Sequence, residues 1–169
     1  ITPEIRELAQ RMVESMQIFD GIGLAAPQIG ASLRLVALDV PAAEDAAKLT
    51  QGELELCPQM PLVVVNPEIL FASPEVGERE EGCLSVPDIY APVTRPLRVM
   101  LRAQTLDGRM IECECGNLLG RCIQHELDHL DGILFVDRLS QEAAAEVARP
   151  LNQLLHYGSK HNFKRVKIK

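Results

Sequence analysis

Hydrophobic side chains recur at helical spacing near the start of the chain. They predict an amphipathic α-helix whose buried face consists of Ile5, Leu8, Ala9, Met12 and Met16. Thr2 is a favoured N-cap residue and Pro3 suits the first helical position, so we expect the helix to begin there. It should end before Asp20, because the glycines and prolines between residues 21 and 30 predict an irregular loop.

Five shorter runs combine β-branched residues or leucines with partial alternation, which predicts β-strands. They span residues 34–40, 62–65, 75–81, 97–103 and 109–115. Asp107-Gly108 lies between the last two runs and favours a tight hairpin, so we expect antiparallel pairing there. The polar, alanine-rich segment 41–61 is predicted to be a surface insertion that contains a helical turn.

Two more helices are predicted in the second half of the chain. The first spans residues 117–130, with Asn117 as its cap and Gly132 as its stop signal. Its apolar side consists of Leu118, Leu119, Cys122, Ile123 and Leu127. The second spans about residues 140–156, and Pro150 is expected to kink or interrupt it.

Size and composition favour one globular domain over residues 1–169. The chain has 169 residues, of which 47% are hydrophobic, enough for one substantial core but few for two domains. No run approaches the roughly eighteen apolar residues that a bilayer span needs, and the N-terminus lacks the pattern of a secretory signal. We therefore expect no membrane partner.

The charge distribution separates a basic tail from an acidic body. The formal net charge of −7 argues against a nucleic-acid-binding protein, because phosphate recognition normally needs a basic surface. The C-terminal tail, from about residue 158 to residue 169, is the exception and carries five lysines and arginines. Such a tail most often aids solubility, and the alternative is contact with an anionic partner such as RNA.

A metal-binding motif, His125-Glu126-Leu127-Asp128-His129, lies within the predicted helix 117–130. Side chains four residues apart project from one helical face, so the two imidazoles can bind one metal ion. In this HExxH pattern the glutamate is a candidate general base. The alternative is a pair of ordinary buried histidines beside a solvated glutamate.

A catalytic metal usually has three protein ligands and one open position, so the motif needs a third ligand. The chain has five cysteines, an odd number without a secretion signal, and we expect thiols or metal ligands in a reducing, cytoplasmic compartment. Cys122 is a poor candidate, because it precedes His129 by about 10 Å along a helix axis.

The remaining cysteines differ in how well they suit a catalytic metal. Cys113 and Cys115 share one face of a predicted strand, but two more thiolates would close the site and make it structural. Cys57 lies in the polar insertion. Cys83 follows a glycine at a strand end and is the best candidate, with an inert buried thiol as the alternative.

Three segments occur in order along the chain: Gly21-Ile22-Gly23-Leu24-Ala25-Ala26-Pro27-Gln28, Glu81-Gly82-Cys83-Leu84-Ser85 and Gln124-His125-Glu126-Leu127-Asp128-His129. This arrangement closely resembles the three signature motifs of the peptide deformylase family, and the similarity extends from about Thr2 to the third helix. The resemblance implies a hydrolase that removes the formyl group from the N-terminal formylmethionine of newly synthesised polypeptides and releases formate. It also implies an α+β fold of antiparallel sheets around a central HExxH helix, with an N-terminal and a C-terminal helix.

The resemblance assigns roles to the motif residues. Cys83, His125 and His129 would bind one divalent metal, with Fe(II) as the native ion and Zn, Ni or Co possible in the same site. A divalent metal lowers the pKa of bound water towards about 7, and Glu126 would act as the general acid/base. The amide of Gln28 and the backbone N–H of Leu84 would stabilise the developing oxyanion.

Other residues are candidates for substrate binding. Gly21 and Gly23 are positions where a substrate strand would approach the backbone, and ordinary turn glycines are the alternative. The candidate walls of the methionine pocket are Ile22, Tyr90 and Leu118, each of which could equally belong to the core, and Glu81 completes the substrate-binding set. The resemblance also implies an ion pair between Asp128 and Arg95 that braces the helix, with two unrelated charges as the alternative.

The chain departs from the family pattern at two places. The family usually has a strand and a short loop before its first helix, whereas this chain starts at Ile1. A start other than methionine favours a native chain with residues before Ile1, and a natively short chain is the alternative. Asp88 replaces a glycine that is common after the second motif, and this exchange is expected to affect a turn.

The expected substrates are N-formylmethionyl nascent peptides, and the basic tail suggests the ribosome as a partner. We expect a bacterial cytoplasmic setting, with an organellar origin as the alternative. One rival function is an HExxH metalloprotease with Glu142 or Glu146 as third ligand, which leaves the other two motifs unexplained. A second rival is a non-enzymatic relative, against which the intact Gln28, Glu126 and ligand set argue.

Overall fold

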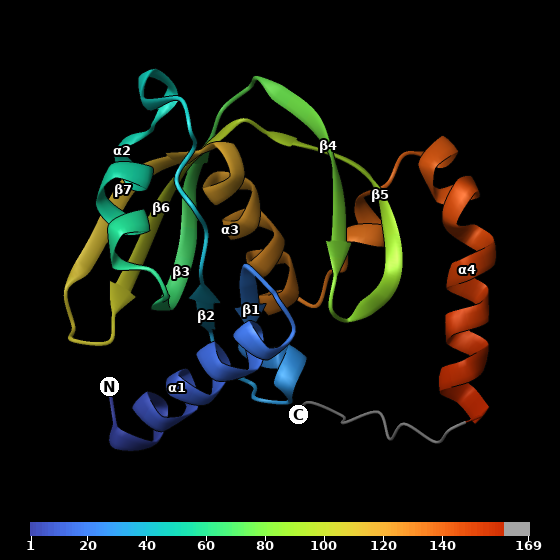
Figure 1. The fold of residues 1–169 in the computed structure, drawn as a ribbon, viewed down its shortest axis with the longest axis horizontal. Coiled ribbons are helices and arrows are strands. Elements are labelled where there is room, and N and C mark those ends of the chain that lie inside the picture. The colour runs from blue at the N-terminus through green and yellow to red at the C-terminus, as the bar shows by residue number, and fades with distance from the viewer. Residues whose placement is uncertain (161–169) are drawn as a thin grey trace. The chain divides into compact units, whose positions relative to one another are not determined.

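A computed structural model describes residues 1–160, with side chains to residue 157 (Figure 1). The described chain divides into two compact units. The first contains Ile1–Gly77 and Arg95–Ile133, and the second contains Glu78–Thr94 and the chain from Leu134 onward. The predicted basic tail lies almost wholly outside the described residues.

The first unit is built on a five-stranded antiparallel sheet with the order β1-β2-β3-β6-β7. Its strands are β1 (Gly23–Ala25), β2 (Leu35–Leu38), β3 (Leu62–Ala72), β6 (Arg98–Thr105) and β7 (Met110–Gly116). The predicted hairpin is confirmed, because β6 pairs with β7 across a turn in which Gly108 has a φ of 92°. That left-handed conformation favours glycine.

Helices cover both faces of this sheet, because successive side chains of a strand point to opposite faces and pack with different helices. In β2, Leu35 and Ala37 pack with Met12 and Met16 of α1 (Pro3–Ile18). Val36 and Leu38 point the other way and pack with apolar residues of α3 (Asn117–Leu130). Because both faces are covered, β2 is apolar at every position. The α3 helix therefore packs on one face of the five-stranded sheet and α1 on the other.

Two parts of the first unit differ from the sequence prediction. The segment 21–30 contains the short strand β1 and the 3-10 helix η1 (Ala26–Ile29), so the prediction of a wholly irregular loop was wrong. Strand β3 continues seven residues beyond the predicted end at Val65. Asn66 there has a φ of 50° and is followed by Pro67, and the pairing with β6 shifts at this point. These irregularities hid the second half of the strand.

The segment 41–61 is more ordered and more buried than a surface insertion. It contains η2 (Ala46–Lys48), α2 (Gln51–Leu56) and η3 (Cys57–Gln59). Helix α2 packs against β7, and Glu53 and Leu56 are each 1% exposed. The prediction of a helical turn is confirmed, whereas the surface position was wrong for these two side chains.

The second unit contains a two-stranded sheet and the C-terminal helix. Strands β4 (Val76–Cys83), which begins in the first unit, and β5 (Val86–Pro96) are joined by the two-residue turn Leu84-Ser85. The core of the unit consists of Val86, Ile89, Ala91, Val93, Phe135 and Val147. Phe135 belongs to η4 (Phe135–Arg138) and Val147 to α4 (Gln141–Lys160). The helix continues through Pro150, so an interruption there is wrong, whereas the alternative of a kink stays a prediction.

Strand β5 was missed by the sequence prediction. It contains three prolines, at positions 87, 92 and 96, and proline is unusual in the interior of a sheet. A strand with only one hydrogen-bonded neighbour tolerates proline, because its other edge needs no donor. The α+β class of the prediction is confirmed, with helices near both ends of the described chain. Among the described helices, none has the length and apolar character that a bilayer span requires.

Candidate metal centre and active site

Two histidines of α3 converge on one point. The Nε2 atoms of His125 and His129 lie 3.2 Å apart, with the rings edge to face and 4.9 Å between centroids. This is the geometry expected of imidazoles one helical turn apart. His129 is buried and His125 is half-buried, so one side of the pair remains open. The two nitrogen atoms are therefore suited to share a metal ion.

Glu126 lies beside the two histidines and is only 4% exposed. Its carboxylate lies against the backbone of β1 at Gly23. A Cβ atom at Gly23 would lie 2.8 Å from Glu126 Cδ and 2.8 Å from Cys122 Sγ, and closer still to Glu126 Oε1. Glycine at position 23 is thus required for the carboxylate to occupy its place, a contact that the sequence analysis did not predict.

The side chain of Gln28 is oriented by its own loop. Its Oε1 accepts a hydrogen bond of 2.8 Å from the backbone N–H of Ala25. Because the carbonyl oxygen is held in this way, the Nε2 group of the amide points to the opposite side. Gln28 is half-buried and can present this N–H group as a donor.

The predicted ion pair between Arg95 and Asp128 is confirmed. Arg95 Nη1 lies 2.8 Å from Asp128 Oδ2, and both side chains are at least nine-tenths buried. A second polar contact also ties α3 to β5, since the side-chain amide of Gln124 donates a 3.0 Å hydrogen bond to the carbonyl oxygen of Pro96. The same amide donates to the carbonyl oxygen of Gly120 within α3 at 3.0 Å. Buried polar contacts of this kind fix the helix that carries the histidines.

Cys83 ends β4 and immediately precedes the turn Leu84-Ser85. Its Sγ accepts a hydrogen bond of 3.4 Å from the backbone N–H of Ser85. An N–H donor stabilises the negative charge of a thiolate, the form that binds metals. Leu84 is 43% exposed, so its side chain is directed away from the core of its unit.

The other four cysteines pack in or against the hydrophobic core of the first unit. Cys113 and Cys115 lie on β7, buried among apolar residues, with their Sγ atoms 3.8 Å apart. Their shared hydrogen bond raises the pKa of Cys115 and lowers that of Cys113. The thiol of Cys122 donates to the carbonyl oxygen of Ile22 at 3.6 Å, as suits a packed thiol. Burial and then Glu53 raise the pKa of Cys57.

The candidate pocket residues differ in exposure. Ile22 is 39% exposed and Tyr90 is 63% exposed, so the alternative that these two belong to the core is wrong. The ring of Tyr90 covers Gly82, where a Cβ atom would collide with it. Leu118 is half-buried and packs against the core of the first unit. The backbone N–H of Gly21 donates to the carbonyl oxygen of Met16 at 2.9 Å, just after the end of α1. The side chain of Glu81 is buried.

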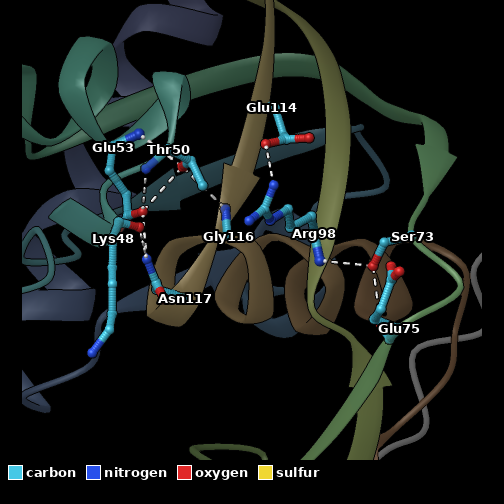
Figure 2. A network of polar contacts seen from close by, with 9 residues as sticks. All are labelled: Lys48, Thr50, Glu53, Ser73, Glu75, Arg98, Glu114, Gly116 and Asn117. Atoms are coloured by element: carbon cyan, nitrogen blue, oxygen red, sulfur yellow. Dashed lines mark hydrogen bonds and ion pairs between the residues drawn. The ribbon is translucent and has the colours of Figure 1, made fainter.

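A buried polar network at the start of α3 was not predicted (Figure 2). Asn117 begins the helix without capping it, and its side chain donates to Glu53 Oε2 at 2.8 Å and to the carbonyl of Lys48 at 3.0 Å. The predicted cap was therefore wrong. Thr50 and Glu53 form a capping box at the start of α2. The T-x-x-E spacing of these two residues is the sequence signature of a capping box and could have predicted the start of α2.

An α+β fold in which one helix presents two histidines and a glutamate is typical of a metal-dependent hydrolase. The family model of polypeptide deformylase matches residues 1–145. The chain therefore belongs to the peptide deformylase family, the enzymes that hydrolyse the N-formyl group of newly synthesised polypeptides.

Individual relatives agree with this assignment. A peptide deformylase of Rhodopseudomonas palustris is 45% identical over 161 residues, which is 95% of this chain and 86% of that protein. Peptide deformylase 2 of Gloeobacter violaceus is 47% identical over 85% of this chain and 71% of that protein. Among solved structures, the peptide deformylase of Plasmodium falciparum has a TM-score of 0.81 at 27% identity and covers 96% of this chain and 88% of its own. Peptide deformylase 1B of Arabidopsis thaliana has a TM-score of 0.79 at 32% identity over 99% of this chain and 88% of its own.

Proposed function

We propose that the deformylase activity of this chain depends on one divalent metal held by Cys83, His125 and His129, with Glu126 as the general acid/base. The observation that carries the proposal is the convergence of two Nε2 atoms, 3.2 Å apart, beside a buried glutamate. Membership of the family supports the reaction itself, the hydrolysis of a formamide bond with release of formate.

The donor chemistry fits a divalent metal. Among the described residues, Cys83, His125 and His129 form the group of cysteine and histidine donors that could bind one ion. Three protein ligands leave a position for a reactant, as catalytic sites require. One thiolate and two imidazoles suit several borderline ions, so we propose Fe(II) as the native metal, with Zn, Ni or Co able to replace it.

In the proposed mechanism one side chain transfers protons, and two N–H donors stabilise the negative charge that develops on the formyl oxygen. A divalent ion in such a site supplies Lewis acidity, which acidifies water and polarises a carbonyl group. The Glu126 carboxylate accepts a proton from the attacking water and then delivers it to the leaving amine nitrogen. The Nε2 group of Gln28, which points away from Ala25, and the backbone N–H of Leu84 donate to the developing formyl oxyanion.

The substrate chain would add to the edge of the five-stranded sheet. Strand β1 is the edge strand in the sheet order, and an extended peptide can pair with such an edge through its backbone. We propose Gly21 and Gly23 as positions where the peptide backbone approaches. Exposed Ile22 and Tyr90 are available to the methionine side chain, and Leu118 and Glu81 complete the proposed set.

The experiment compares Glu126→Gln with the unchanged chain. Formate release from formyl-Met-Ala-Ser and metal content are measured together under anaerobic conditions. We expect the variant to retain its metal and to lose activity, because the amide cannot accept the proton. Full activity of the variant would refute the role of Glu126. Cleavage of an internal peptide bond without formate release would favour a protease.

Metal removal tests the ligand set independently. Treatment with a chelator should abolish formate release, and Fe(II), Ni(II) or Co(II) should restore it. Cys83→Ala is expected to lower the bound metal to well below one equivalent, whereas Cys122→Ala should leave it unchanged. Equal metal content in these two variants would contradict the assignment of Cys83.

The cellular setting is part of the same proposal. The bacterial relatives support a bacterial cytoplasmic enzyme that acts on nascent chains, and the family match over residues 1–145 supports a single peptide deformylase domain. The basic tail would contact the ribosome near the peptide exit. Unchanged co-sedimentation with ribosomes after deletion of residues 160–169 would exclude this contact.

A further inference from the structure

The helix that carries the histidines begins at a left-handed backbone position. Asn117 has a φ of 49°, in a region that glycine and, among other residues, Asn and Asp adopt most readily. Its side-chain amide uses both hydrogens, one to Glu53 Oε2 and one to the carbonyl of Lys48. These two bonds hold Asn117 in its conformation, so the direction in which α3 leaves β7 depends on them.

Glu53 is the centre of this network, as Figure 2 shows. Its carboxylate accepts from Thr50 N and Thr50 Oγ1 at 3.0 Å each, from Ala43 N at 3.3 Å and from Asn117 Nδ2 at 2.8 Å. All four donors are neutral, and the Nζ of nearby Lys48 pairs instead with Asp45 at 3.0 Å. A buried carboxylate is costly unless hydrogen bonds compensate it. Four converging donors therefore fix its position closely.

The same network holds the chain just before α3. The backbone N–H of Gly116 donates to Thr50 Oγ1 at 3.2 Å. A Cβ atom at Gly116 would lie 2.8 Å from Thr50 Cγ2, and one at Gly120 would lie 2.6 Å from the carbonyl oxygen of Cys115. The first turn of α3 thus packs closely against Thr50, the N-cap of α2, and against the end of β7.

From these contacts we infer that Glu53 is a positioning residue for the metal-binding histidines, a role that rests on the metal site proposed above. His125 follows Asn117 by eight residues, which is about 12 Å along the helix axis. A tilt of roughly 5° at the first turn would displace His125 by about 1 Å over that length. Displacements of this size at a reacting centre can reduce a rate about 100-fold.

The test uses Glu53→Gln, with Glu55→Gln as a matched control on the same helix. Glu55 is exposed and its carboxylate accepts from Gln51 Nε2 at 2.8 Å. The readouts are kcat and KM for formyl-Met-Ala-Ser, the visible absorption bands of the Co(II)-loaded protein, and the imidazole ¹⁵N shifts of the metal-free protein. For Glu53→Gln we expect at least a tenfold lower kcat, a KM within twofold, and changes in both spectra. Glu55→Gln should change none of them.

A purely structural role gives a different result. It would lower the melting temperature of Glu53→Gln while kcat and both spectra stay unchanged, and that result would overturn the inference. If Glu53→Gln does not fold, Asn117→Gly permits the positive φ but removes the bond to Glu53. Unchanged spectra and kcat in that variant would equally overturn it. If the unchanged chain binds no Co(II), the proposed metal site fails, whereas the ¹⁵N shifts still test the position of the histidines.

Discussion

Substitution of Gly23 by alanine should remove activity while leaving the fold intact. The added methyl group would lie 2.8 Å from Glu126 Cδ and 2.8 Å from Cys122 Sγ. Such atoms normally remain about 3.5 Å or more apart. The end of the glutamate side chain can move, so the collision is relieved by a shift of the carboxylate of about 1 Å. That shift displaces the atom proposed to transfer protons.

Two effects of opposite sign determine the change in the free energy of unfolding, and the displacement of the carboxylate determines the change in kcat. Alanine in place of glycine lowers the conformational entropy of the unfolded chain and so stabilises the fold by about 0.4–1 kcal/mol, whereas overpacking costs about 1–3 kcal/mol. We therefore expect a net loss of about 1 kcal/mol in the free energy of unfolding. A misplacement of about 1 Å in the reacting groups lowers kcat about 100-fold, equivalent to about 2.7 kcal/mol of barrier.

Gly77→Ala is the matched control. It lies in strand β4, and its Cβ atom would meet Leu97 Cδ2 at 2.6 Å. Leu97 is 50% exposed and can turn outward, so we expect a similar change in stability and an unchanged kcat. Steady-state formate release gives kcat and KM, and urea unfolding gives the stability of each variant.

The split between kcat and KM distinguishes two roles of Gly23. A lower kcat with little change in KM indicates displacement of Glu126. A higher KM with a normal kcat would instead show that Gly23 makes room only for the substrate. Wild-type kcat and KM in Gly23→Ala would refute the reasoning altogether.

Three further predictions follow from local geometry. Asp88 has a φ of 61°, so Asp88→Gly should raise the free energy of unfolding by about 1 kcal/mol without changing kcat, and a lower melting temperature would contradict this. Asp128→Asn leaves the buried Arg95 without its charge partner and should lower the free energy of unfolding of the metal-free protein by about 3 kcal/mol. Asp131→Asn breaks the exposed pair with Arg34 and should lower it by less than about 1 kcal/mol. Equal losses in urea unfolding would refute the difference. Since burial and then Glu53 raise the pKa of Cys57, its alkylation by iodoacetamide at pH 8 should be slower than that of a peptide thiol and should accelerate only above the usual thiol range. Mass spectrometry of the labelled peptide measures this rate, and a peptide-like rate would contradict the shift.

The helices and the convergence of the two histidines could be predicted because both depend on local periodicity. The His125 to His129 spacing fixes two imidazoles on one face of a helix, whatever the rest of the chain does. The bounds of α3 agree with the predicted range 117–130. The Arg95–Asp128 pair was implied by family resemblance, and its two residues lie 33 positions apart, so no local pattern could have shown it.

The missed features depend on contacts between distant segments. Strand β5 contains three prolines, and it tolerates them because it has a single hydrogen-bonded neighbour, β4. Asn117 resembles an N-cap residue, but Glu53, which lies 64 positions earlier, recruits its side chain instead. The contact of Gly23 with Glu126 likewise joins two motifs that a sequence comparison treats as separate.

The ordered nature of segment 41–61 also matters for protein engineering. Its polar, alanine-rich composition makes it an obvious target for loop shortening or for the insertion of an affinity tag. The structure argues against both, because Thr50 and Glu53 within it bind Gly116 and Asn117 at the beginning of α3. Shortening the segment at α2 would also remove Leu56, which belongs to the core of the first unit.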